Sequence, residues 1–105
     1  MSCHLVVTPA ANRDIDEAIN WYDSQEGGLG NRFIAAVQDR FMEISKFPLS
    51  SRLIPNTAAR KSLLSHWPYF IYYRIVNEVI RVFAVIHTSR DPNYILSRVD
   101  HSPAH

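Results

Sequence analysis

The run from Tyr69 to Pro92 is the densest series of β-branched and aromatic residues in the chain. In its middle, Asn77 and Glu78 form a polar pair between two apolar segments, which predicts two strands joined by a tight turn. Once the turn is placed, residues on the two strands face each other in a fixed register. The predicted pairs are Arg74 with Arg81, Tyr72 with Phe83 and Phe70 with Val85.

This register divides the hairpin into two surfaces, because side chains alternate between the faces of a strand. One surface is apolar and must be covered: Ile71, Tyr73, Ile75, Ile80, Val82, Ala84 and Ile86. The other is aromatic and cationic: Phe70, Tyr72, Arg74, Arg81, Phe83, Val85 and His87. Two arginines directly opposite each other are destabilising unless an anion answers them. We therefore expect this second surface to be open and to dock a partner.

The segments before the hairpin predict one strand and two helices. Leu5–Val7 is a short run with strand propensity. Thr8-Pro9 starts a helix, since threonine caps free amides and proline is favoured at the first helical position, and apolar spacing continues the helix to near Asp23. Three glycines at positions 27, 28 and 30 then impose a turn. A second helix is predicted at about Leu29–Phe47, and Pro48 stops it.

The fold class predicted from this order is α+β: an N-terminal strand, a helical hairpin, then a three-stranded antiparallel meander, with the helices packed on one face of the sheet. Pro48–Ala59 is a predicted loop, and Arg60–Leu64 is the first strand of the meander. Residues 1–98 form the single predicted domain. Residues 99–105 are a predicted flexible tail, and just before it Tyr94, Ile95 and Leu96 are candidates for docking.

The composition excludes several classes of protein. A net charge of +1 argues against nucleic-acid binding through bulk electrostatics, and we expect no direct sequence-specific DNA binding by this chain alone. The single cysteine, Cys3, excludes an internal disulfide, and the five histidines lack ligand spacing, so no metal or cofactor is expected. No apolar run approaches the roughly 20 residues that cross a bilayer, and no signal peptide is visible. We expect a cytoplasmic protein.

The sequence resembles the RelE/ParE superfamily of bacterial toxins from type II toxin-antitoxin modules over nearly its whole length. The resemblance rests on Thr8-Pro9-Ala10-Ala11, Asp14-Ile15, Trp21-Tyr22, Phe47-Pro48, Arg60, the run Pro68 to Arg74 and the run His87 to Pro92. RelE-like members are ribosome-dependent endoribonucleases that cut messenger RNA. ParE-like members share the fold, lack most of the basic catalytic set, and act on DNA gyrase.

Two departures favour the ParE-like branch. RelE-like members place an arginine after the position that resembles Tyr69, where this chain has Phe70. They also carry lysines along the preceding strand, which here becomes apolar at Leu63-Leu64. The resemblance therefore implies a toxin that inhibits gyrase by binding and has no catalytic residues. One alternative is a ribosome-dependent nuclease that uses Arg60, Arg74, His87 and Arg90. Another is a non-toxic remnant that only binds an antitoxin.

The candidate residues for binding the target or the antitoxin are Arg60, Tyr72, Arg74, Arg81, Phe83, His87 and Arg90. The expected partner is a cognate antitoxin whose disordered C-terminal segment folds on binding. Structural interpretations stand beside these functional ones. The arginines of the hairpin can pair with internal carboxylates such as Glu78 or Glu43, and His87 can hydrogen-bond a neighbouring loop. Arg60 can simply be solvated at a strand edge.

Overall fold

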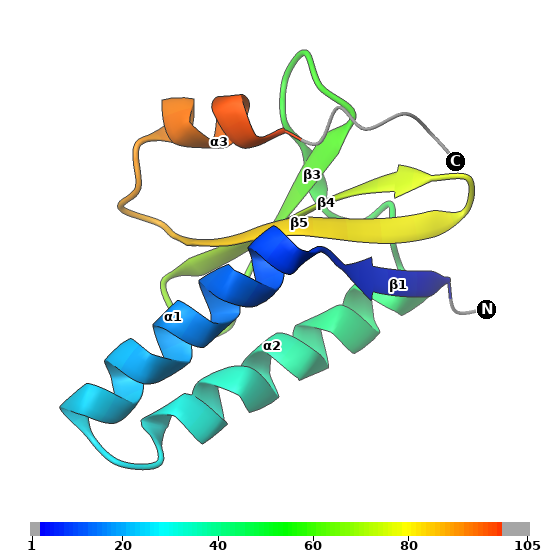
Figure 1. Cartoon of the computed structure of the whole chain (residues 1–105). Helices are drawn as coiled ribbons and strands as arrows, with labels where there is room; N and C mark the ends of the chain where they lie inside the picture. Colours follow the sequence, from blue (N-terminus) through cyan, green and yellow to red (C-terminus); the bar gives the residue numbers. More distant parts are fainter. Residues whose placement is uncertain (1–2, 100–105) are drawn as a thin grey trace.

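The computed structural model describes residues 3–99 and places two long helices on one face of a five-stranded sheet and a short helix on the other (Figure 1). The elements are β1 His4–Val7, α1 Pro9–Gln25, α2 Leu29–Lys46, β2 Arg52–Leu53, β3 Ala59–Leu63, β4 Tyr69–Val76, β5 Val79–His87 and α3 Pro92–Arg98. The strand order is β1-β5-β4-β3-β2. β1 pairs parallel to β5, and the other pairs are antiparallel. The predicted α+β class and the meander β3-β4-β5 are confirmed.

The helical hairpin forms from the local signals that predicted it. The Thr8 side chain accepts a hydrogen bond from the amide of Ala11 at 3.2 Å, and Pro9 occupies the first position of α1. Gly28 caps α2 with a φ of 92°, a left-handed conformation that favours glycine. α2 ends at Lys46 with Phe47 as its C-cap. Both predicted helices are confirmed to within about two residues at each end.

The turn between the helices is closed by a carboxylate from α1. The Asp23 side chain accepts a hydrogen bond from the amide of Gly30 at 2.8 Å, in the first turn of α2. The approach is so close that a Cβ built on Gly30 would lie 2.8 Å from that carboxylate. Asp23 thus satisfies one of the free amides at the start of α2, a role that Gly28 cannot fill because it has no side chain.

The central hairpin follows the predicted register only near its turn. Asn77 and Glu78 both have positive φ, at 50° and 66°, which is the geometry of a two-residue hairpin turn. Arg74 pairs with Arg81, as predicted. A bulge between Tyr72 and Tyr73 then shifts the pairing, so that Tyr72 lies opposite Ala84 instead of Phe83, and Phe70 lies opposite Ile86 instead of Val85.

The bulge exchanges the faces of β5 beyond Phe83. Val85 belongs to the core beneath α1 and α2, whereas Ala84 and Ile86 belong to the core on the opposite face. The predicted faces of these three residues are wrong, because strict alternation cannot anticipate an inserted residue. Residues on the turn side of the bulge, including Ile80 and Val82, lie under the helices as expected.

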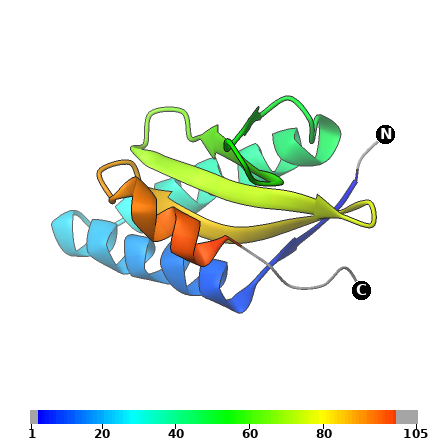
Figure 2. The same ribbon diagram turned by 90° about the horizontal axis from the view of Figure 1, so that it is seen from above.

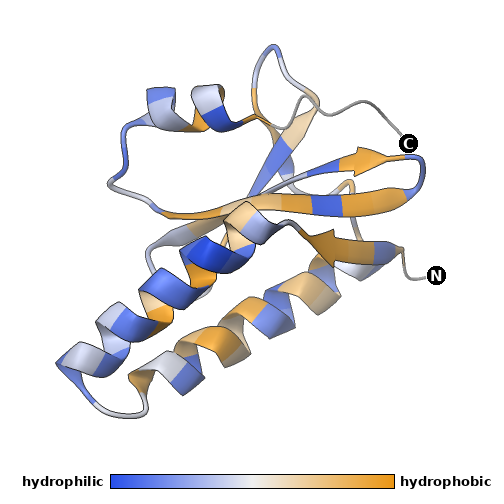
Figure 3. Cartoon of the chain, in the orientation of Figure 1, coloured by the Kyte–Doolittle hydropathy of each residue, from blue (hydrophilic) through white to orange (hydrophobic). Residues whose placement is uncertain are grey.

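The second face of the sheet is covered, contrary to the prediction that it is open. Tyr72 is 7% exposed and Phe83 is 4% exposed, and both pack in a core with Ile95 of α3. Figure 2 shows α3 lying across this face of the sheet. In Figure 3 apolar residues concentrate on β1, β4 and β5, which lie between the helices of the two faces. An aromatic sheet face requires a cover, and the chain supplies its own.

Two elements were not predicted. The Asp91 side chain accepts from the amide of Asn93 at 2.9 Å and Pro92 opens α3, the same cap-then-proline signal as Thr8-Pro9. A two-residue strand, β2, lies inside the predicted loop and pairs with β3. Residues 100–105 of the predicted flexible tail lie outside the described residues. Among the helices of residues 3–99, none has the length and apolarity to cross a membrane.

Replacement of Asp23 tests the closure of the helical hairpin. We expect Asp23→Ala to lower the free energy of unfolding by about 1 kcal/mol, because the amide of Gly30 loses its capping partner. Urea unfolding followed by circular dichroism measures the change. Asp16→Ala is the matched control, since Asp16 is an exposed aspartate of the same helix. Its cost should stay within about 0.5 kcal/mol. Equal losses in the two variants would contradict the capping role.

Candidate functional site

β5 continues beyond the end of its neighbour β1, which leaves part of its edge without a strand partner. The last pair between the strands is Val7 with Val82, and the amide of Thr8 donates to the carbonyl of Val82 at 2.9 Å. Past this point the carbonyl of Phe83 and the amide of Val85 have no strand beside them on that edge. Buried backbone groups require hydrogen-bond partners, so side chains must supply them here.

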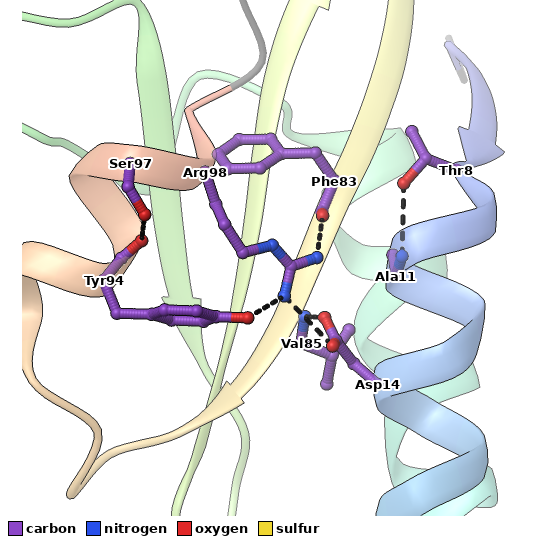
Figure 4. A network of polar contacts seen from close by, with 8 residues as sticks. All are labelled: Thr8, Ala11, Asp14, Phe83, Val85, Tyr94, Ser97 and Arg98. Carbon is purple, nitrogen blue, oxygen red and sulfur yellow. Dashed lines mark hydrogen bonds and ion pairs between the residues drawn. The ribbon is translucent and has the colours of Figure 1, made fainter.

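Asp14 of α1 and Arg98 of α3 supply these partners (Figure 4). Arg98 Nη2 donates to the carbonyl of Phe83 at 2.9 Å, and Asp14 Oδ2 accepts from the amide of Val85 at 3.0 Å. The two side chains also form an ion pair, with Arg98 Nη1 3.0 Å from Asp14 Oδ1. We call this arrangement the Asp14–Arg98 clamp, because it joins α1, β5 and α3 at one point.

The clamp is largely withdrawn from water. The side chains of Arg98 and Asp14 are 16% and 13% exposed. Burial lowers the pKa of the Arg98 guanidinium. The hydrogen bonds to Asp14 and Tyr94 together raise this pKa by more, so the net shift is upward. Arg98 Nη1 also donates to the hydroxyl of Tyr94 at 3.2 Å. The guanidinium therefore keeps its charge and bonds to three different residues.

Beside the clamp lies a cleft of about 430 Å³ between α1, the end of β5 and the loop that leads to α3. Its polar and aromatic lining consists of Asp14, Glu17, Trp21, Tyr69, His87, Ser89, Arg90, Asp91 and Tyr94. We call it the α1–β5 cleft. Trp21 is 57% exposed in it, which is unusual for a large aromatic ring. In residues 3–99, no group of three or more His, Cys, Asp or Glu side chains could hold a metal ion.

His87 lies on the helix side of the sheet and not on the predicted cationic face. The bulge places it opposite Tyr69, whose ring stacks edge-on against the imidazole at 5.2 Å. The amide of Ser89 donates to Nδ1 of His87 at 3.0 Å, and the Ser89 hydroxyl lies 2.8 Å from the same nitrogen. An amide can only donate, so Nδ1 is the acceptor and the neutral ring carries its hydrogen on Nε2. The structural interpretation of His87 as a partner of a neighbouring loop is confirmed.

Tyr69 links the cleft to the aromatic core. Its ring contacts those of Tyr22 and Phe33, with centroids 6.1 Å and 5.0 Å away. Burial raises the pKa of Tyr69 to about 12, and the electrostatic effect of an ionised Tyr22 and a hydrogen bond to Tyr22 add to the increase. The phenol is therefore protonated at neutral pH and cannot serve as a general base there.

Arg90 is the exposed cation of the cleft. Its guanidinium lies over the ring of Tyr94, 4.0 Å from the centroid, which is a cation–π contact. The ring of Tyr94 is also within 5.5 Å of Arg98, so a single tyrosine of α3 orders both arginines. A planar guanidinium held in this way is well suited to bind a carboxylate or a phosphate.

The remaining predicted residues lie away from the cleft. Arg60 Nη1 donates to the carbonyls of Leu49 and Ser51 at 3.2 Å and 2.7 Å, and so secures the loop after α2. Arg74 lines a separate cavity of about 310 Å³ with residues of α3 and of the loop before β3. It lies five residues along β4 from Tyr69, the partner of His87, which corresponds to roughly 17 Å. Arg81 pairs with Arg74 at that end of the hairpin.

Arg60, Arg74, His87 and Arg90 therefore do not converge on one point. Asp14, Trp21 and Arg98 were not among the predicted site residues. The signal for Asp14 was present: it lies three residues after Ala11 and four before Ala18, on the buried stripe of α1. An acid on such a stripe requires a partner. The signal for Arg98 was its position three residues after Ile95, the buried residue of α3.

The clamp can be tested by a double-mutant cycle. We expect Arg98→Ala to lower the free energy of unfolding by about 3 kcal/mol, because it leaves the buried Asp14 carboxylate without its counter-charge. The double variant with Asp14→Ala should cost clearly less than the sum of the single changes. Chemical unfolding gives all four values. Arg32→Ala is the control, since Arg32 forms an exposed pair with Glu26 and should cost less than about 1 kcal/mol. Additive losses at Asp14 and Arg98 would refute the clamp.

The raised pKa of Tyr69 predicts how stability depends on alkaline pH. Between pH 10.0 and about 12 the unfolded chain releases this proton and the folded chain retains it. The ionisation of Tyr69 therefore does not change the free energy of unfolding below that window. Within the window, the free energy of unfolding falls as pH rises. The free energy of unfolding of Tyr69→Phe, measured by urea titration, should fall less steeply with pH across the window than that of wild type. Identical slopes would show that the phenol ionises equally in both states.

The sequence matches a known protein family over most of its length. The profile described as "ParE toxin of type II toxin-antitoxin system, parDE" matches residues 5–92. No curated protein sequence matches the chain. Among solved structures, the chromosomal ParDE toxin-antitoxin system from P. aeruginosa aligns with a TM-score of 0.76 at 15% identity, covering 84% of this chain and 98% of that chain.

Two further structures come from the RelE side of the superfamily. The toxin-antitoxin complex RelBE2 from Mycobacterium tuberculosis aligns with a TM-score of 0.59 at 20% identity, over 83% of this chain and 99% of that chain. A mutant of the E. coli toxin RelE in the free state aligns with a TM-score of 0.61 at 15% identity, over 95% and 100%. These likenesses show a shared fold. Because the profile matches most of its length, the chain belongs to the ParE toxin family of type II toxin-antitoxin systems.

Proposed function

We propose that this protein is a toxin that inhibits DNA gyrase by binding it, and that a cognate antitoxin neutralises it in the cytoplasm. Membership of the ParE family supports the toxin role. An antitoxin partner is supported by two of the similar structures, which are toxin-antitoxin assemblies. The choice between binding and catalysis rests on the arrangement of the cationic residues.

The dispersal of Arg60, Arg74, His87 and Arg90 is the observation that carries the proposal. Cleavage of RNA requires groups that activate a 2′-hydroxyl, stabilise the phosphate and protonate the leaving oxygen, all within reach of one phosphate. Here Arg60 bonds to two loop carbonyls, and Arg74 lies roughly 17 Å along the sheet from His87. A partner surface tolerates such separation, because its contacts are spread over a wide area.

The hydrogen bonding of His87 supports the same conclusion. Its Nδ1 accepts from Ser89, and the other ring nitrogen therefore carries a hydrogen in the neutral form. In this tautomer the ring can donate through Nε2, and its acceptor nitrogen is already occupied by Ser89. The neighbouring phenol, Tyr69, is protonated at neutral pH because its pKa is about 12. Both groups are thus set for recognition by hydrogen bonding.

Supercoiling by purified gyrase tests the proposal directly. We expect an excess of this protein to abolish supercoiling and to cause cleaved DNA to accumulate, and preincubation with the antitoxin to prevent both effects. Gyrase that retains full activity with excess protein would contradict the proposal. Growth arrest on expression separates an active toxin from a remnant that only binds an antitoxin.

A ribosome-dependent nuclease is the second candidate, and the fold shared with RelE favours it. Primer extension on translated messages distinguishes the two functions, because only the nuclease leaves cuts phased to codons. We expect no such cuts. If they appear, Arg90→Ala should reduce them more than Arg60→Ala, since only Arg90 lies in the α1–β5 cleft.

A further inference from the structure

The α1–β5 cleft has two walls of different chemistry. α1 contributes Glu17 and Trp21, which are four residues apart and therefore lie on one side of the helix. The loop after β5 contributes His87 and Arg90. The Trp21 ring contacts the Tyr22 ring edge-on, with centroids 5.0 Å apart, and remains 57% exposed. An exposed tryptophan that lines a cleft is the kind of anchor that dominates binding at protein interfaces.

The opposite wall presents hydrogen-bond donors in fixed directions. Nδ1 of His87 is occupied by Ser89, which leaves Nε2–H as the donor that the ring can offer a ligand. The guanidinium of Arg90 lies over the ring of Tyr94, 4.0 Å from the centroid, and this contact orders it before any ligand arrives. Ordered donors lose less conformational entropy on binding. This wall therefore suits one carboxylate.

The charges around the cleft distinguish a peptide from a nucleic acid. Three carboxylates line it, namely Asp14, Glu17 and Asp91. Asp14 is neutralised by Arg98, and Asp91 caps α3, but Glu17 stands on the wall opposite Arg90. Successive phosphates of a strand would meet this acidic wall, which is unfavourable. A peptide that places one acidic side chain at Arg90 and an apolar one at Trp21 avoids that repulsion.

The size of the cleft indicates what kind of partner enters it. A volume of about 430 Å³ between a helix and a loop admits a few side chains of an extended segment and excludes a folded surface. A segment that folds on binding can insert such side chains. We propose that the α1–β5 cleft receives an acidic and apolar segment of the cognate antitoxin, with its carboxylate on Arg90 and His87 and its apolar side chain on Trp21. This inference rests on the proposed function of the chain as a toxin.

Binding of two cleft variants tests the proposal. The probe is the purified antitoxin. It is identified as the protein that is encoded beside this gene and restores growth in cells expressing the wild-type protein. We expect Arg90→Glu and Trp21→Ala each to raise its Kd roughly tenfold or more in titration calorimetry. Arg32→Glu and Met42→Ala are matched controls, because Arg32 and the 60% exposed Met42 lie on α2, outside the cleft. Their Kd should remain that of wild type.

A charge exchange provides the specific readout. Acidic residues of the antitoxin segment are changed to lysine one at a time, and one such change should restore affinity for Arg90→Glu while weakening binding to wild type. Unchanged affinity in both cleft variants, or equal losses in the α2 controls, would overturn the proposal. The proposal would also be overturned if short single-stranded RNA, but not the antitoxin, quenched the fluorescence of Trp21. The Trp21→Ala variant gives the emission of Trp67, which is subtracted.

The growth assay separates failure of this inference from failure of the proposed function. If the wild-type protein arrests growth and the neighbouring product restores it, but the cleft variants bind as tightly as wild type, then only the cleft assignment is wrong. If expression causes no arrest, the toxin role is wrong and the cleft assignment falls with it. Both variants change exposed side chains, so loss of folding does not confound the result.

Discussion

The Asp14–Arg98 clamp supplies hydrogen-bond partners where β5 extends beyond the end of its neighbour β1. β1 ends at Val7, and the exposed edge of β5 would otherwise leave a carbonyl and an amide unpaired beside the core. The two side chains replace the missing strand, and because they also pair with each other, the replacement requires both α1 and α3 to be in place. The positions of both walls of the α1–β5 cleft follow from this contact.

The bulge at Phe83 decides which residues reach that cleft. One unpaired residue in β5 moves Val85 and His87 to the helix side, where Tyr69 and α1 lie, and leaves Ala84 and Ile86 beneath α3. Without the bulge, His87 would share a face with Arg74. A single inserted residue thus places His87 and Arg74 on opposite faces of the sheet, whereas strict alternation predicts one shared face.

Sequence reasoning succeeded where local rules act alone and failed where tertiary contacts act. Thr8-Pro9, the glycines after α1 and the Asn77-Glu78 turn each determine their structure through neighbouring backbone atoms. No local rule signals the bulge, because Val82–Ile86 is a continuous apolar run in which no polar residue marks either face. α3 was missed although Asp91-Pro92 carries the same signal as Thr8-Pro9, because seven residues give too few apolar positions for a helical period.

The hydrogen bonds of the polar side chains on the sheet support the proposal that this chain acts by binding. Arg60 secures a loop, His87 accepts from Ser89, and Asp14 and Arg98 complete a sheet edge. Each of these side chains bonds to a backbone group and so contributes to holding the fold. In the described part of the chain, residues 3–99, the side chains of Trp21, Glu17 and Arg90 make no hydrogen bond to a backbone group. Together they present an aromatic ring, a carboxylate and a guanidinium cation. These groups can select a peptide by shape and charge, but they lack the convergent cations that phosphate chemistry requires.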